Sequence, residues 1–175
     1  MNKEKLPKRK NIRLKNYDYS EPGSYFITIC TQNKEKLLWD GELEVEKFIW
    51  EPVGEHCVLP KGLPLSKNGI VAEQNLKKWN DTYKNVCLSS YVIMPNHLHI
   101  IVMILSEKSG STQCSPTVSR MVKLFKESVT KQLGVSMWQK SFYDRIIRDK
   151  HDYETISKYI RENPLRWEFD ELYEK

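Results

Sequence analysis

Runs of β-branched and aromatic residues recur along the chain, and several of them alternate between apolar and polar positions. Such runs are typical of β-strands. They predict strands over residues 25–31, 85–94, 97–104 and 142–148. The Asp40-Gly41 pair stands between two further short apolar runs and predicts a hairpin over residues 37–45.

Apolar residues spaced three and four apart predict three helices, because this spacing places them on one helical face. The helices are expected over residues 70–83, 117–133 and 152–162, and Pro164 ends the last one. Residues 46–59 are expected to form a short helix or irregular structure, and residues 60–69, rich in proline and glycine, a loop.

Without the 37–45 hairpin and the last helix, the predicted order of elements is β-α-β-β-α-β. This order predicts an α+β fold of the ferredoxin-like kind, an antiparallel sheet with helices on one face, followed by a separate C-terminal helix. The length of 175 residues suits a single domain, which we expect over residues 21–175 after a basic N-terminal arm over residues 1–20.

The positive charge is concentrated in the arm, because residues 1–15 hold seven basic residues and one acid while the rest of the chain is close to neutral. An arm of this kind either grips phosphates or serves as a solubilising tail. No apolar run is long enough to cross a bilayer, and no apolar segment follows the basic N-terminus. The four cysteines are scattered and form no Cys-x-x-Cys pair, so we expect free thiols in a cytoplasmic protein.

The strongest candidate for chemistry is the pair His97 and His99 in the predicted strand 97–104. Side chains alternate along a strand, so both imidazoles point to one face while Leu98 and Ile100 point to the other. Two imidazoles on one face can share a divalent metal ion. The alternative is a pair of partly buried, hydrogen-bonded histidines without a ligand.

The last helix carries a second candidate pair. Tyr159 and Asn163 are four residues apart and therefore share one helical face, next to the apolar residues Ile156 and Ile160. If the two isoleucines dock the helix on the sheet, Tyr159 and Asn163 can lie over the histidines. The alternative is structural, because asparagine before proline often ends a helix and tyrosine often fills an amphipathic face.

These motifs together resemble the REP-associated tyrosine transposases, a branch of the single-tyrosine HUH transposases. The resemblance extends from about Arg13 to Trp167, although residues 47–69 match the family poorly. It rests on the segments Pro95-Asn96-His97-Leu98-His99, Trp138-Gln139-Lys140-Ser141-Phe142-Tyr143-Asp144, Ile147-Arg148-Asp149 and Tyr159-Ile160-Arg161-Glu162-Asn163-Pro164, with Pro22-Gly23-Ser24-Tyr25-Phe26-Ile27-Thr28 ahead of them.

The resemblance implies that Tyr159 is the catalytic nucleophile and that His97, His99 and Asn163 bind one metal ion. Two imidazole nitrogens and an amide oxygen suit Mg²⁺ or Mn²⁺ when phosphate oxygens complete the coordination. The implied reaction cleaves and rejoins single-stranded DNA through a 5′-phosphotyrosine, at repeats that form hairpins.

The implied partner is single-stranded or hairpin DNA, bound by a monomer or a homodimer that lies on the nucleoid. We expect its phosphates to contact basic residues of the arm and of the 117–133 helix: Lys8, Arg9, Lys10, Arg13, Lys15, Lys123 and Lys126. Two other functions use the same residues and remain open. One is a DNA-binding regulator that does not cleave, and the other is a single-metal hydrolase in which water replaces the tyrosine.

Overall fold

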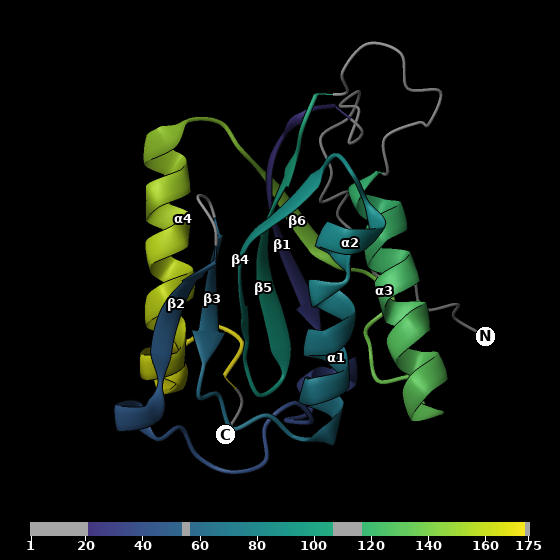
Figure 1. Cartoon of the computed structure of the whole chain (residues 1–175). Coiled ribbons are helices and arrows are strands. Elements are labelled where there is room, and N and C mark those ends of the chain that lie inside the picture. Colours follow the sequence, from purple (N-terminus) through teal and green to yellow (C-terminus); the bar gives the residue numbers. More distant parts are fainter. Residues whose placement is uncertain (1–20, 54–56, 107–116, 174–175) are drawn as a thin grey trace, which may run out of the picture.

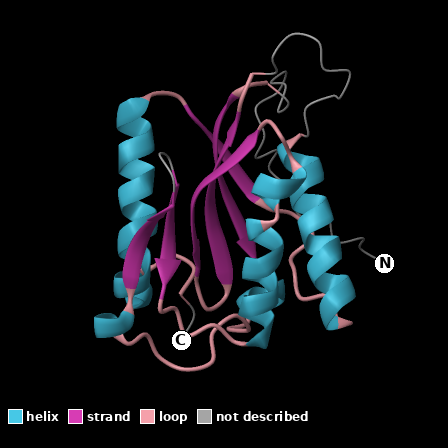
Figure 2. Cartoon of the chain, in the orientation of Figure 1, coloured by secondary structure: helices cyan, strands magenta, loops and turns pink. Residues whose placement is uncertain are grey.

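A computed structural model of the chain describes residues 21–53, 57–106 and 117–173. In this part of the chain a six-stranded sheet separates two layers of helices (Figures 1 and 2). The strands are β1 Gly23–Cys30, β2 Ile49–Val53, β3 Cys57–Lys61, β4 Val86–Ile93, β5 His97–Ile104 and β6 Tyr143–Ile147. The helices are α1 Lys67–Lys77, α2 Trp79–Thr82, α3 Val118–Leu133 and α4 Lys150–Glu162, with 3₁₀ turns η1 Gln32–Lys34, η2 Val45–Lys47 and η3 Asn163–Phe169.

The strand order across the sheet is β2-β3-β4-β5-β1-β6. β5 is antiparallel to both of its neighbours, β1 and β4, and β6 is antiparallel to β1. β1 and β4 therefore run in the same direction with β5 between them, so the α1 connection from β1 to β4 is a split crossover. The α+β fold expected from the sequence is confirmed, and four strands follow the predicted β-α-β-β-α-β order.

Helices cover both faces of the sheet. On one face α1 and α3 pack against inward side chains of β5 such as Leu98 and Ile100, and this layer forms the larger core. On the other face α4 is the only α-helix of the described residues seen in Figure 1. Its side chains Ile156 and Ile160 pack with Ile101 of β5 in a second, smaller core. The sequence predicted helices on one face of the sheet and a separate C-terminal helix. In the structure this last helix, α4, packs on the opposite face of the sheet from α1 and α3.

Local capping explains where the long helices begin. The hydroxyl of Thr117 accepts a hydrogen bond from the Arg120 N–H at the start of α3. The carboxylate of Asp149 does the same for the Asp152 N–H at the start of α4, at 2.8 Å. Each cap satisfies a backbone N–H that has no partner inside the helix, which fixes the start of the helix.

The predicted 37–45 hairpin is wrong. Leu38 instead exchanges backbone hydrogen bonds with Pro95 and Ser66, and the Asp40 N–H donates to the Pro64 carbonyl at 2.8 Å. The backbone of this segment is therefore satisfied by residues distant in sequence, so the Asp-Gly turn does not close a two-stranded ladder.

Residues 46–59 were expected to form a short helix or irregular structure, which fits the 3₁₀ turn η2 that ends at Lys47 but is wrong for the described residues from Ile49 on. They contribute to the antiparallel pair β2 and β3, in which Trp50 lies opposite Pro60. β3 joins the main sheet through a parallel pairing of Val58 with Ser90. The sequence did not predict these two strands because they contain Pro52 and Pro60. Proline lacks the N–H that strand pairing uses, so it is found mainly in strands at the edge of a sheet.

Within the described ranges, no helix combines the length and the apolar character that crossing a membrane requires. Cys30 and Cys87 are free thiols, as expected. The basic arm, residues 1–20, and Cys114 lie outside the described residues.

Gly69 offers a test of how α1 meets the 37–39 segment, since a Cβ at this position would lie 2.2 Å from the Leu38 carbonyl oxygen. We expect Gly69→Ala to lower the free energy of unfolding by about 1–3 kcal/mol, although alanine normally favours a helix. Urea unfolding measures the change. Gly23→Ala is the control, because its nearest atom would be 3.8 Å away. It should change stability by less than about 0.5 kcal/mol, and equal effects of the two variants would contradict the packing seen here.

Candidate metal centre and nucleophile

The imidazoles of His97 and His99 lie on the α4 face of β5, as their spacing predicted. Both are buried, and their Nε2 atoms are 3.0 Å apart. Burial lowers the pKa of His97 to about 3, helped by the Lys34 ammonium. Burial likewise moves the pKa of His99 well below its usual range, with His97 adding to the effect. Both rings are therefore neutral near pH 7, which is the form that binds a metal ion.

Asn96 fixes the tautomer of His97. Its amide NH₂ donates to the carbonyls of Lys34 and Leu172, at 3.2 and 2.8 Å, so its Oδ1 must be the atom that faces His97 Nδ1 at 2.7 Å. His97 Nδ1 is then the protonated nitrogen, and Nε2 presents a lone pair. Orientation of a histidine through its second nitrogen is typical of metal ligands.

His99 is oriented from the neighbouring strand. Thr28, directly opposite on β1, places its hydroxyl 2.9 Å from His99 Nδ1. If His99 donates this hydrogen bond, its Nε2 also carries a lone pair, and the two facing lone pairs repel unless a cation lies between them. If the hydroxyl donates, His99 Nε2–H bonds to His97 instead. The arrangement thus suits a cation and also has a stable metal-free form.

Tyr159 extends from α4 to the histidines. Its hydroxyl is 3.2 Å from His99 Nε2 and donates to the Asp170 carboxylate at 3.1 Å. Tyr159 is 43% exposed, so the residue faces solvent as well as the two histidines. Burial of the hydroxyl and the adjacent Asp170 charge raise the pKa of Tyr159, and the Asn163 amide offsets part of this rise. The phenol is therefore protonated at neutral pH and needs a proton acceptor to react.

Asn163, one turn after Tyr159, is buried beside it. Its NH₂ donates to Asp170 at 2.8 Å, and this fixes the orientation of the amide because a carboxylate only accepts. Its Oδ1 is left buried and without a hydrogen-bond partner among the described residues. A buried carbonyl oxygen without a partner is costly, and a cation or a donor would satisfy it.

Asp170 is the residue that the sequence analysis missed. It follows η3, and its two oxygens accept bonds from Tyr159, Asn163 and the Leu172 N–H. One oxygen of Asp170, together with one nitrogen each of His97 and His99, forms a group within 4.8 Å that could hold a metal ion. No periodic signal marks Asp170, since η3 has irregular backbone geometry and Glu168 and Glu171 lie beside it in sequence.

Of the expected DNA-binding residues, the structure describes Lys123 and Lys126, both on α3. Lys8, Arg9, Lys10, Arg13 and Lys15 lie outside the described residues. Lys123 lies on α3, which packs on the opposite face of the sheet, and pairs with Glu127 at 3.7 Å. Lys126 donates to the carbonyls of Gln139 and Ser141, at 2.7 and 2.9 Å, and its burial lowers its pKa to about 8.

The low pKa of His97 makes stability depend on pH. Unfolded His97 takes up a proton near pH 6.5, whereas folded His97 does so only near pH 3. The free energy of unfolding should therefore fall as the pH drops through this window, by about 2 kcal/mol between pH 7 and pH 5. Urea unfolding in the presence of a chelator measures this slope. His97→Gln should reduce the slope, and the exposed α4 variant His151→Gln should keep it; the same slope in both variants would contradict this assignment.

Removal of the Asn96 amide should weaken metal binding without removing a ligand, because His97 loses the partner that fixes its tautomer. We expect Asn96→Ala to lower the affinity for Mn²⁺ by about 10- to 100-fold, measured by titration with electron paramagnetic resonance. Asn75→Ala is the control, since Asn75 is a buried asparagine on α1, away from the site. Equal Mn²⁺ affinity in the wild type and in Asn96→Ala would exclude the positioning role.

Comparison with known proteins finds a relative by sequence and a similar fold among solved structures. The chain is 33% identical over 184 residues to an uncharacterized protein from Haemophilus influenzae, covering 94% of this chain and 93% of that protein. No protein-family model matches the chain. Among solved structures, a REP-associated tyrosine transposase bound to a REP hairpin superposes with a TM-score of 0.57 at 20% identity, over 89% of this chain and 74% of that one. The chain therefore belongs to one family with the Haemophilus influenzae protein, and it has the fold of the REP-associated tyrosine transposases, as its sequence motifs implied.

Proposed function

We propose that this protein is a metal-dependent transposase or endonuclease of single-stranded DNA that cleaves and rejoins strands through a tyrosine. The observation that carries the proposal is the position of the Tyr159 hydroxyl, 3.2 Å from one of two facing, neutral imidazoles. A nucleophile beside a cation-binding group is the arrangement that phosphoryl transfer requires. The similarity of the fold to that of a transposase bound to hairpin DNA supports the same function.

His97, His99 and Asn163 are the proposed ligands of one divalent ion, Mg²⁺ or Mn²⁺. The unpartnered Oδ1 of Asn163 and the fixed lone pair of His97 fit that role. When bound, the ion would polarise the scissile phosphate and offset the charge that develops on its oxygens.

The chain itself supplies the nucleophile and a proton acceptor. In the proposed step, the Tyr159 oxygen bonds to phosphorus while the bond to the 3′ oxygen breaks, which leaves a 5′-phosphotyrosine and a free 3′-hydroxyl. The phenolic proton passes to Asp170, which already accepts a hydrogen bond from it at 3.1 Å. The proton lost by the phenol balances the proton gained by the 3′ oxygen. One phosphodiester replaces another, so a 3′-hydroxyl can reverse the step and rejoin the strands.

The proposed substrate is a single-stranded or hairpin DNA bound in the cleft at Tyr159. This cleft has a volume of about 940 Å³ and runs between β1, β6 and α4, with Phe26, Tyr143 and Arg145 in its walls. The basic arm would add contacts to phosphates, whereas Lys123, on the opposite face of the sheet, is not part of this proposed contact. Lys126 would act by holding the Gln139–Ser141 loop, because its ammonium is bonded to the carbonyls of both residues and both line the cleft.

A DNA-binding regulator that does not cleave is the second candidate. It is favoured by the contacts of Asp170, which occupy both the Tyr159 hydroxyl and the Asn163 amide and contribute to the raised pKa of the phenol. Such a protein would bind the same DNA without forming a covalent bond.

Incubation with a labelled hairpin oligonucleotide and Mn²⁺, followed by a denaturing gel, separates these functions. A transposase forms a covalent protein–DNA adduct, which Tyr159→Phe should reduce by more than about 1,000-fold without reducing DNA binding. Tyr143→Phe is the matched control, because Tyr143 lines the same cleft with a similar exposure, 44% against 43%. It should keep the adduct.

The remaining outcomes of this assay each contradict the proposal. Binding without cleavage indicates the regulator, and cleaved DNA without an adduct indicates hydrolysis by water. An adduct that survives in Tyr159→Phe places the nucleophile at another residue.

A further inference from the structure

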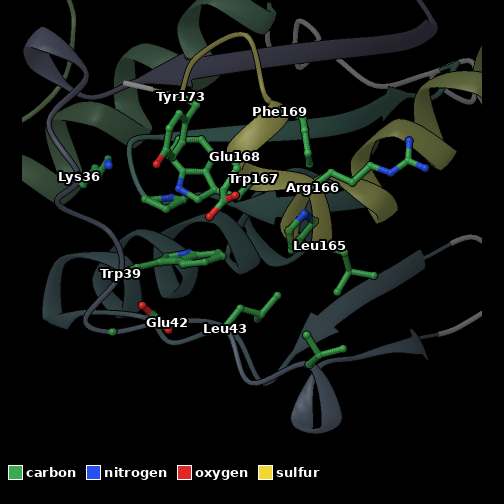
Figure 3. Close-up of a pocket in the computed structure, with 14 residues that line it drawn as sticks. Lys36, Trp39, Glu42, Leu43, Leu165, Arg166, Trp167, Glu168, Phe169 and Tyr173 are labelled. Atoms are coloured by element: carbon green, nitrogen blue, oxygen red, sulfur yellow. The ribbon is translucent and has the colours of Figure 1, made fainter. Parts of the chain in front are cut away.

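A second cavity lies next to the catalytic cleft, on the other side of η3. It has a volume of about 530 Å³, within the range of sites that bind small organic groups. Figure 3 shows Trp39, with Glu42 and Leu43, along one side of it and Trp167, Tyr173 and Phe169 along the other. The two sides come from segments far apart in the sequence, the loop after η1 and the C-terminal η3 region.

We propose that this cavity binds an unstacked nucleobase of the single strand, next to the phosphate that Tyr159 attacks. The inference rests on the proposed function and names a part of its substrate. Bases that leave the stack are typically held between aromatic side chains, with polar groups around their edges.

The aromatic groups of the cavity are oriented but not covered. The indole N–H of Trp39 donates to the Ile93 carbonyl at 2.7 Å, which fixes the ring while the side chain stays only partly buried. Phe169 is 86% exposed, so most of its phenyl ring is left uncovered by the described residues. A base stacked in the cavity would cover this apolar surface.

The cavity adjoins the proposed catalytic group. The Trp167 ring lies 5.9 Å from the His97 ring, centroid to centroid, and Phe169 lines both the cavity and the cleft of Tyr159. η3 begins at Asn163 and is followed by Asp170, so one short segment supplies residues to both places. In the proposed complex, a strand with its phosphate at Tyr159 would carry a neighbouring nucleotide toward the cavity.

The charges at the cavity fit a nucleotide better than a purely apolar partner. Lys36 and Arg166 are exposed among the lining residues, and the Lys36 ammonium lies 4.7 Å from the centre of the Tyr173 ring. These cations suit the phosphates on either side of a bound base. The carboxylates of Glu42 and Glu168 are exposed there as well and can accept hydrogen bonds from amino groups on the edge of a base.

The test is an abasic scan, in which each unpaired nucleotide beside the hairpin is replaced in turn by an abasic residue. Loss of one stacked base should weaken binding to the wild-type protein by about 5- to 150-fold at one or two positions, measured by fluorescence anisotropy at constant salt. In Trp39→Leu the same replacement should cost less than about 2-fold, because the stacking surface is already gone. Trp39→Phe should restore the penalty in part.

Two further variants guard against a general loss of structure. Phe169→Ala removes an exposed side chain and should also reduce the abasic penalty. Ile70→Ala removes an exposed apolar side chain of α1, on the other face of the sheet, and should leave the wild-type profile unchanged. A wild-type profile that is flat at every position, or an undiminished penalty in Trp39→Leu, would overturn the proposal.

This proposal and the proposed function fail in different ways. A normal adduct on Tyr159 together with a flat abasic profile overturns the nucleobase cavity alone. A position-specific abasic penalty that depends on Trp39, without any adduct, supports the cavity and overturns the transposase reaction.

Discussion

The 3.0 Å approach of the His97 and His99 Nε2 atoms is the constraint on which the rest of this site depends. Each ring is held by a partner of its own, Asn96 for His97 and Thr28 for His99, so neither can turn away to relieve the contact. Burial keeps both rings neutral. Two neutral, immobilised imidazoles with converging nitrogens are a candidate cation site, and the cost of orienting them is already met when the protein folds.

The same constraint extends to the C-terminal segment. Asn96 bonds at once to His97, to the Lys34 carbonyl and to the Leu172 carbonyl, so it joins the start of β5 to the chain beyond η3. Asp170 closes the arrangement from the other side through Tyr159 and Asn163. Hydrogen bonds therefore join the candidate nucleophile and the candidate ligands on the α4 face of the sheet, and the cavity of Trp39 and Trp167 lies beside them.

This assembly has consequences for reactivity. Asp170 contributes to the raised pKa of Tyr159 and accepts a hydrogen bond from its hydroxyl, so it disfavours a preformed phenolate. In the proposed reaction the same carboxylate would accept the phenolic proton. Phe169 lines both this cleft and the neighbouring cavity, and Trp39 lines the cavity alone.

Periodicity in the sequence determined the parts of this protein that follow local rules. The two-residue repeat of a strand placed His97 and His99 on one face, and the four-residue spacing in α4 placed Tyr159 and Asn163 together over Ile156 and Ile160. Only the tertiary structure decided what joins these parts. The pairing of Leu38 with Pro95 and Ser66, the strands hidden by Pro52 and Pro60, and the carboxylate of Asp170 beside Tyr159 all depend on contacts between residues distant in sequence or on irregular backbone, and no local repeat encodes such contacts.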